Sequence, residues 1–305
     1  MRIVLAGGSG FLGQALGDRL LADGHAVVLL SRRADSFSRH PELSAVRWTP
    51  DGSAGAWSGE LDGADAIVNL AGATIGRRWT AARKREILQS RVLSTRSLTA
   101  AVRSVKTKPR VFVQMSGVGF YGAYDDGPTF DEGSSPGSDF LAGVCVAWEA
   151  EAQPVAVLGT RLVILRNGIV LSPKGGALKK MLPPFQLFVG GPIASGRQWM
   201  PWIHLDDWVG LVLWSIDNAS ASGPINAVAP EATTNAQFAK ALGRALHRPS
   251  LLPVPGFVLK TMFGEFATAG LICGQHVVPR RALDLGYQFK YPSVSTPGTF
   301  SSSGR

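Results

Sequence analysis

Short apolar runs alternate with longer amphipathic segments through the first half of the chain. The runs are rich in Val, Ile and Leu and have the length of buried strands. They cover residues 2–6, 26–30, 45–48, 66–70, 111–115 and 160–165. Between them, residues 11–22 and about 80–105 have the apolar spacing of helices. Strands that are apolar on both faces and separated by helices are typical of a parallel sheet covered on each side, so the pattern predicts an α/β fold.

The pattern changes after about residue 170. Pro and Gly become frequent, and strands no longer alternate regularly with helices. Helical character returns in four segments, at residues 206–216, 235–246, 257–267 and 280–285. We expect this half to form a smaller substrate lobe over the carboxyl edge of the sheet, where open α/β folds bind their ligands.

Three regions follow from this reading. Residues 1–168 are expected to form a nucleotide-binding domain, and residues 169–292 a smaller substrate lobe that is interleaved with it. Residues 293–305 include TPGTFSSSGR, a composition typical of a flexible tail.

The amino-acid composition indicates a globular protein without a membrane span. The chain has 305 residues, of which 45% are hydrophobic and 17% charged, as in globular proteins. No apolar run is long enough to span a membrane, and no secretory signal is visible. The two cysteines, Cys145 and Cys273, have neither metal-ligand spacing nor a disulfide framework. We expect a cytoplasmic protein, or one of an organelle stroma if a transit peptide has been removed, with no metal site and no membrane partner.

The net charge of +9 favours an anionic ligand. Its Lys and Arg residues are dispersed, and no aromatic residues are interleaved with them as in nucleic-acid-binding motifs. We therefore expect a polyanionic small molecule and no nucleic acid. The sequence leaves a monomer and a homodimer equally open.

The stretch AGGSGFLG joins the first expected strand to the first helix. Gly7 allows a tight turn, Gly10 lets the backbone approach a pyrophosphate, and Gly13 lets the helix pack on the strand. The pyrophosphate then lies on the free N–H groups of the first helical turn, at Phe11 and Leu12. This array in this context predicts a dinucleotide site and a Rossmann doubly wound parallel sheet.

Two further strand ends belong to the same expected site. The second strand ends in VVLLSRR, which places Ser31, Arg32 and Arg33 where an NAD-preferring site has Asp or Glu. Guanidinium groups bind a phosphate, so these residues predict NADP(H), although two arginines could also simply begin a surface loop. The fourth strand ends in IVNLAG, whose small residues let the backbone pass close to the ribose. These residues are Leu70, Ala71 and Gly72.

These elements together resemble the extended short-chain dehydrogenase/reductases, the superfamily of the nucleotide-sugar epimerases. A closer resemblance is carried by six further motifs, which are WTAARKREILQSRVLSTR, MSGVGFYG, FDEGSSPGSDFLAGVCVAWE, GGPIASGRQWMPWIHLDDW, INAVAPEATTNAQF and GQHVVPRRALDLGYQFKYP. Through them, residues 1 to about 292 resemble epimerase family 39U, member 1, which has plant, animal and bacterial members, some labelled cell-division-inhibitor-like. The tail departs from that family, which usually ends in a short amphipathic helix.

The resemblance implies that NADP(H) is bound by Ser31 and Arg32, by the backbone around Leu70 and Ala71, and by further residues downstream. These are Glu86, Arg91 and Val170. Arg91 falls where extended reductases carry an Asn that touches the cofactor. Pairing of Arg91 with Glu86 on the helix surface is the weaker reading, because five residues is a poor helical offset. Val170 is equally well read as a core valine.

The catalytic end departs from the superfamily pattern. Extended reductases carry a Ser or Thr after the fifth strand and a Tyr-x-x-x-Lys pair on the next helix, which exchanges a proton while hydride moves. Counting back from Glu149 places Leu141 and Cys145 at the tyrosine and lysine positions. The pair is therefore absent, and we read Cys145 as a packed hydrophobe.

Substitutes for the missing pair lie nearby. Ser116 and Tyr121, in MSGVGFYG, are the candidate catalytic residues. Asp131 and Glu132 begin a loop expected to close over the substrate. Candidate substrate-pocket residues are Arg197, Trp202 and His204. For His204, a hydrogen-bonded role in the fold is the preferred alternative.

Two functions compete on this reading. The first is an NADP(H)-dependent oxidoreductase or epimerase that acts on a small polar metabolite or a nucleotide sugar. The second is a non-catalytic regulatory protein that senses NADP(H) and is linked to cell or organelle division. The identity of the substrate is open in either case.

Overall fold

The computed structural model describes residues 1–34 and 40–301 of the chain. Its centre is a seven-stranded sheet in the order β10-β7-β5-β4-β1-β2-β3, in which all neighbouring strands run parallel. The strands are β1 (Arg2–Ala6), β2 (Ala26–Ser31), β3 (Leu43–Arg47), β4 (Ala66–Asn69), β5 (Val111–Gly117), β7 (Arg161–Asn167) and β10 (Gly223–Ala227). The order reverses between β1 and β4, which is where ligands bind in a doubly wound fold. The predicted α/β fold is confirmed.

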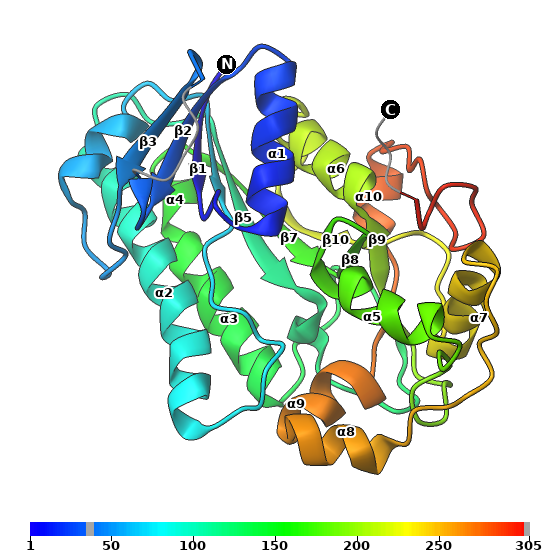
Figure 1. Ribbon diagram of the computed structural model, residues 1–305. Coiled ribbons are helices and arrows are strands. Elements are labelled where there is room, and N and C mark those ends of the chain that lie inside the picture. Colours follow the sequence, from blue (N-terminus) through cyan, green and yellow to red (C-terminus); the bar gives the residue numbers. More distant parts are fainter. Residues whose placement is uncertain (35–39, 302–305) are drawn as a thin grey trace.

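Helices cover both faces of this sheet (Figure 1). On one face, α1 (Phe11–Ala22) and α6 (Leu205–Asp217) contact each other and share a core with the strands. The other face carries α2 (Ala81–Ser104), α3 (Phe140–Ala152) and α4 (Pro154–Val157). Side chains fix where the long helices begin, because Thr80 accepts a hydrogen bond from the Arg83 N–H and Asp139 accepts one from the Ala142 N–H.

Strand β10 is an addition from the second half of the chain that the sequence pattern did not predict. It pairs with β7 so that Ile225 lies beside Leu165, and α6 lies between the two strands in the sequence. The series of apolar runs that ends at residues 160–165 therefore misses one strand of the sheet. The reason is that β10 is a short edge strand that begins with Gly223 and Pro224 and lacks a continuous apolar run.

The remaining elements follow the carboxyl ends of the central strands. Two small parallel ladders join β8 (Ile169–Ser172) to β9 (Trp202–His204) and β6 (Thr129–Phe130) to β11 (His276–Val277). Short helical turns are η2 (Ala56–Leu61), η3 (Val118–Tyr121) and η4 (Thr268–Ile272). The other helices are α5 (Gly176–Gln186), α7 (Asn235–Ala245), α8 (Gly256–Phe263), α9 (Glu265–Ala267) and α10 (Arg280–Asp284). In Figure 1, α5, α7 and α8 lie on the side away from β1, β2 and β3.

Part of the expected tail packs against this second region. Val294 and Thr299 are buried, and the Phe300 ring lies 5.4 Å from the Phe238 ring in an edge-on contact. The prediction of a flexible tail from residue 293 therefore does not describe residues 293–301, and residues 302–305 lie outside the described residues. Within the described ranges, no helix has both the length and the apolar character needed to cross a membrane.

Candidate dinucleotide site and catalytic end

The turn between β1 and α1 is shaped by the protein's own packing at two glycines. Gly7 has a φ of 79°, and a Cβ on it would lie 2.8 Å from the Ala71 nitrogen at the end of β4. A Cβ on Gly13 would lie 2.5 Å from the Gly8 Cα, so only glycine lets α1 approach the turn. Both residues are therefore fixed by sterics alone.

Gly10 differs from these two because nothing in the protein crowds it. It is the N-cap residue of α1, and a Cβ on it would meet only the Gly7 carbonyl oxygen, at an ordinary 3.5 Å. No side chain caps this helix end, so the first N–H groups of α1, at Phe11 and Leu12, are available to a ligand. The absence of a side chain at Gly10 thus leaves open backbone at a helix N-terminus, which suits a pyrophosphate.

The end of β2 lies beside this turn. The Gly7 N–H donates to the Leu30 carbonyl at 3.4 Å, which brings the following residues next to the glycine array. Ser31 is buried and its hydroxyl accepts a hydrogen bond from the Arg33 N–H at 3.1 Å, whereas the side chains of Arg32 and Arg33 are exposed. The structure thus places a hydroxyl and two guanidinium groups where the sequence predicts the 2′-phosphate contact.

The end of β4 forms another side of the site. Asn69 is fully buried, and its side-chain oxygen accepts a hydrogen bond from the Ala71 N–H at 3.1 Å. Its amide nitrogen donates to Thr95 at 2.9 Å and to Gln114 at 3.0 Å. Asn69 therefore fixes the path of Leu70 and Ala71. Asn69 is not among the predicted site residues, although a polar residue inside an apolar strand is a usable signal.

Arg91 projects from α2 against the loop after β4. Its Nη1 donates to the carbonyls of Ala73 and Ile87, both at 3.0 Å, and its guanidinium lies 5.0 Å from the centre of the Trp148 ring. Burial lowers the pKa of Arg91 to about 10, and the positive charge of Arg83 acts in the same direction, so Arg91 stays cationic at neutral pH. Arg91 thus adds a positive charge beside Gly72, where a Cβ would lie 3.1 Å from the guanidinium carbon.

Glu86 does not share the position of Arg91. Its side chain is 56% exposed and forms an ion pair with Arg83, one helical turn earlier, at 2.5 Å. The weaker alternative for Arg91, pairing with Glu86, is therefore not what the structure shows.

Val170 lies on β8 and packs against the main core as a partly buried residue. The turn after β8 closes on the start of α1, since a Cβ on Gly175 would lie 2.3 Å from the Phe11 ring. Val170 and Phe11 are thereby brought into one region, as their assignment to one site requires.

At the catalytic end, Ser116 is tied to a buried ion pair. Its hydroxyl donates to Glu149 at 2.7 Å, and Arg166 donates to both oxygens of the same carboxylate at 2.9 Å. The side chains of Arg166 and Glu149 are only 5% and 9% exposed. Ser116 is thus held by a charge pair that joins α3 to β7, and its proton points toward Glu149.

Tyr121 is part of the same buried network, which corrects its assignment as a candidate catalytic residue. Its side chain is fully buried, its hydroxyl donates to Asn226 at 2.7 Å, and it accepts from Arg166 at 3.1 Å. Burial raises the pKa of Tyr121 to about 12, despite the opposing charge of Arg166. A phenol with both of its hydrogen-bonding roles occupied inside the core cannot deliver a proton to a bound substrate.

The two positions of the missing pair are filled by packed side chains. Leu141 faces Gly119, where a Cβ would lie 3.2 Å from the leucine Cβ. The Cys145 thiol lies 3.6 Å from the Gly117 carbonyl, and burial raises its pKa to about 11, so it stays protonated at neutral pH. The positive charge of Arg91 acts on Cys145, so α2 supplies a cation near the position where a lysine is absent.

Asp131 and Glu132 anchor the fold instead of covering a substrate. Asp131 pairs with Arg280 at 3.1 Å. Glu132 accepts hydrogen bonds from the Asn226 and Arg281 N–H groups at 2.8 and 3.2 Å. They hold α10 and β10 in place, so the expected role of this loop is corrected.

The three substrate-pocket candidates are not brought together in one pocket. Arg197 is exposed, whereas Trp202 and His204 are almost fully buried on β9. His204 accepts a hydrogen bond from the Asp206 N–H at 3.1 Å and packs on Tyr291, and burial lowers the pKa of its imidazole. His204 is therefore a residue of the fold, as the preferred alternative states.

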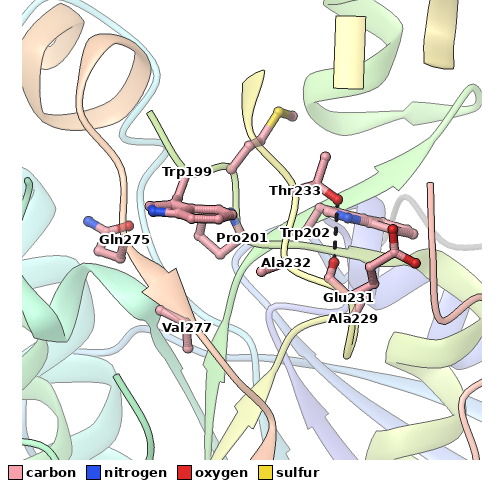
Figure 2. A pocket seen from close by; sticks show the side chains of 10 residues that line it. Trp199, Pro201, Trp202, Ala229, Glu231, Ala232, Thr233, Gln275 and Val277 are labelled. Atoms are coloured by element: carbon pink, nitrogen blue, oxygen red, sulfur yellow. Dashed lines mark hydrogen bonds between the residues drawn. The ribbon is translucent and has the colours of Figure 1, made fainter. Parts of the chain in front are cut away.

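Trp202 borders a small cavity instead of an open cleft (Figure 2). The cavity measures about 10 Å³, room for about one water molecule. Figure 2 shows Trp199 and Trp202 on its two sides, with Pro201 and Ala232 between them. The assignment of Trp202 to a substrate pocket is therefore corrected.

Within the described ranges, no group of three or more His, Cys, Asp or Glu side chains is placed to hold a metal ion. The functional groups that the structure brings together are the open glycine turn, the cationic end of β2 and the loop after β4 with Arg91. This arrangement suits an elongated anionic ligand laid across the switch point of the sheet.

Comparison with known proteins identifies relatives over nearly the whole chain. Residues 3–228 match the NAD dependent epimerase/dehydratase family, and residues 254–296 match a domain of unknown function, DUF1731. The chain is 40% identical to the chloroplastic SDR39U1 homolog of Arabidopsis thaliana, an epimerase family protein, over 96% of this chain and 84% of the relative. It is 38% identical to the epimerase family protein YfhF of Bacillus subtilis, over 96% and 95% of the two chains.

A solved structure is similar over the same extent. The crystal structure of human epimerase family protein SDR39U1 with NADPH is 37% identical, covers 97% of both chains and has a TM-score of 0.85. The similarity therefore includes the small second region as well as the central sheet.

Proposed function

Since the chain belongs to the NAD dependent epimerase/dehydratase family, we propose that it binds NADP(H) and uses it as an oxidoreductase or epimerase on a small polar metabolite or nucleotide sugar. The observation that carries the proposal is Gly10. Its neighbours leave space for a side chain, yet the residue is glycine and lies at the uncapped start of α1. A pyrophosphate at this point would account for the open backbone.

The end of β2 supports NADP(H) over NAD(H). Ser31, Arg32 and Arg33 provide a hydroxyl and two cations beside the glycine turn, and no carboxylate lies among them to bind a ribose 2′-hydroxyl. A guanidinium makes charge-assisted hydrogen bonds to a phosphate. The related human protein has been solved with NADPH, which is consistent with this preference.

Leu70, Ala71, Glu86, Arg91 and Val170 are the further residues that we assign to the cofactor. Arg91 is the strongest of them, because its partly buried cation lies beside the loop after β4. Glu86 is the weakest, because its carboxylate is exposed and paired with Arg83. When bound, the nicotinamide supplies hydride transfer.

The proton must move by another route than in the usual Tyr-x-x-x-Lys enzymes. Leu141 has no proton to give, Cys145 stays a buried thiol, and Tyr121 is enclosed in the core. Ser116 is the hydroxyl at the end of β5, and because it donates to Glu149, its oxygen remains able to accept a hydrogen bond. We assign Ser116 to orienting a substrate carbonyl-bearing or hydroxyl-bearing group, with the substrate itself taking part in proton exchange.

The replacement of the usual Tyr-x-x-x-Lys pair by Leu141 and Cys145 also favours a second candidate function. A protein that keeps the cofactor site and lacks the usual proton donor is suited to sensing the NADP(H) pool without turning over a substrate. The two functions differ in one observable property, the transfer of hydride to a product.

Transfer of deuterium from labelled NADPH distinguishes them. Purified protein is incubated with a metabolite extract and NADPH carrying deuterium on one face of the nicotinamide, and then with the opposite label. For a reductase we expect one product that gains one deuterium from one face only, identified by mass spectrometry. NADPH binding without transfer from either face would contradict net reduction. It would leave the sensor or an epimerase that starts from the oxidised cofactor.

A further inference from the structure

The positive charge of the chain is concentrated in two segments. Residues 173–205 and 232–264 contain no Asp or Glu, and they carry most of the net charge of +9. The rest of the chain is close to neutral. The basic residues of the two segments are Lys174, Lys179, Lys180, Arg197, Lys240, Arg244, Arg248 and Lys260.

The two segments fold together as one unit. The Ala236 N–H donates to the Gly196 carbonyl and the Asn235 N–H to the Gln198 carbonyl, both at 2.9 Å. Apolar side chains of α5 and α7 share one core cluster, which includes Leu178 and Phe238. Figure 1 shows α5, α7 and α8 on one side of the molecule. Cations that lie far apart in the sequence are thereby brought to one side of the molecule, in two segments that contain no Asp or Glu.

Exposed apolar side chains project from two neighbouring loops of this region. We call them the loop-tip patch, which consists of Leu187, Phe188, Val189, Leu251 and Leu252, each at least 50% exposed. The two loops are joined, since the Leu252 N–H donates to the Gly190 carbonyl at 3.4 Å and the Arg248 guanidinium lies 4.5 Å from the centre of the Phe188 ring. Arg248 therefore places a cation directly beside the apolar tips.

The chain holds these side chains outward in an ordered conformation. The Leu187, Phe188 and Val189 N–H groups each donate to a carbonyl of the last turn of α5, and Phe188 has a φ of 64°, which is costly for a bulky residue. The second loop is stiffened by Pro249 and Pro253. Ordered loops lose little entropy when a partner covers them, so this surface is prepared for contact.

We propose that the loop-tip patch and its surrounding cations dock the protein on an anionic lipid bilayer surface. Apolar side chains at loop tips can enter the interfacial layer, while Lys and Arg around them interact with anionic headgroups. The absence of Asp and Glu from the two segments favours an anionic partner. Because the apolar side chains project outward, they suit a deformable partner such as the interfacial layer of a bilayer. Such docking needs no membrane-spanning helix, so it is compatible with the lack of one among the described residues. It departs from the expectation of no membrane partner, which considered only a membrane-spanning segment.

Sedimentation with lipid vesicles tests the proposal on the full chain. Vesicles of phosphatidylcholine alone are compared with equimolar phosphatidylcholine and phosphatidylglycerol at an ionic strength of about 0.1 M. We expect binding to the anionic vesicles at least about 10-fold stronger than to the neutral ones, and largely lost at about 1 M salt, where charges are screened.

Matched variants separate the two components of the surface. Phe188→Ser combined with Leu251→Ser is expected to weaken binding to anionic vesicles by about 10-fold or more. Lys179→Gln with Lys180→Gln is expected to weaken it by several-fold. Val157→Ser removes an equally exposed apolar side chain at α4, and Arg103→Gln removes a charge at the end of α2; both should bind as the unchanged protein does. NADPH binding of each variant checks that it is folded.

Four results would overturn the proposal. The first is equal binding to neutral and anionic vesicles, and the second is no binding to either. The third is unchanged binding by the Phe188/Leu251 variant. The fourth is a concentration-dependent dimer that this variant abolishes while vesicle binding is absent, which would assign the surface to a second copy of the chain.

Discussion

The β1–α1 turn and the β5–α3 end of the sheet are built in opposite ways. At the β1–α1 turn, Gly7 and Gly13 are fixed by packing, whereas Gly10 is left open at an uncapped helix end. At the β5–α3 end, Glu149, Arg166 and Tyr121 are tied to one another inside the core, and Ser116 donates its hydroxyl proton to this network. The β1–α1 turn thus offers backbone groups to a ligand, whereas the β5–α3 end is held by the protein's own contacts.

The contrast separates a part of the fold that can accept a ligand from one whose polar groups are already paired. At the turn, no side chain caps the start of α1, so its first N–H groups are available to a ligand. The contacts at the other end are already satisfied within the protein, by a buried bidentate ion pair and a phenol with two partners. Unpaired polar groups at the turn are therefore expected to bind a ligand, whereas the paired groups at the β5–α3 end are expected to stabilise the fold.

The largest expected effect on stability comes from breaking the buried ion pair at the β5–α3 end. Glu149→Ala leaves the Arg166 charge buried without its carboxylate, which should lower the free energy of unfolding by about 3–5 kcal/mol. Glu151 on the same helix pairs with Arg96 at 2.6 Å but near solvent, so Glu151→Ala should cost less than about 1 kcal/mol. Urea unfolding of both variants measures the difference. Similar costs for the two would show that the buried pair is not what holds this end together.

A second experiment compares two glycines of the β1–α1 turn. Gly13→Ala forces a methyl group within 2.5 Å of the Gly8 Cα, and it should lower the free energy of unfolding by about 1–3 kcal/mol. Gly10→Ala meets no such contact and should cost at most about 1 kcal/mol. It should nevertheless weaken NADPH binding by at least about 10-fold, because the methyl group occupies the approach of the pyrophosphate. Thermal unfolding and calorimetric titration measure the two quantities. Unchanged NADPH affinity in Gly10→Ala would remove the main support for the proposed cofactor site.

The smallest expected effect concerns the pH dependence of stability. Burial raises the pKa of Tyr121 to about 12, above the value of about 10 for a tyrosine in an unfolded chain. The folded state therefore keeps this proton longer, and its contribution to stability, complete below about pH 10, is lost as the pH rises toward 12. Tyr121→Phe should remove this part of the alkaline loss, so its unfolding free energy should fall less steeply above pH 10. Parallel slopes for the two proteins, measured in urea across this range, would show that Tyr121 does not hold its proton in the fold.

Much of the fold follows from local sequence. Helix α1 has the predicted bounds, and α2 differs by about one residue at each end, because apolar periodicity and the Thr80 cap act over a few residues. The glycine turn and the end of β2 are also local features, which is why Gly7, Gly10, Ser31 and Arg32 fall side by side as expected.

The missed features depend on contacts between distant segments. Nothing near Tyr121 in the sequence reveals that Asn226, 105 residues later, accepts its hydrogen bond. The burial of His204 against Tyr291 and the addition of β10 to the sheet have the same origin. The cofactor site at the glycine turn therefore stays a prediction that rests on local features, whereas the sequence overestimated the number of free polar groups around Tyr121.

The most direct test of the central claim is a calorimetric titration of the protein with NADPH and with NADH. We predict that NADPH binds more tightly, and that Arg32→Ala weakens NADPH binding by about 10- to 100-fold while it hardly changes NADH binding, because a charge-assisted hydrogen bond contributes about 1.5–3 kcal/mol. Arg103→Ala, at the far end of α2, serves as the control. Equal affinities for the two nucleotides, or the same loss for both in Arg32→Ala, would contradict a site built for the 2′-phosphate.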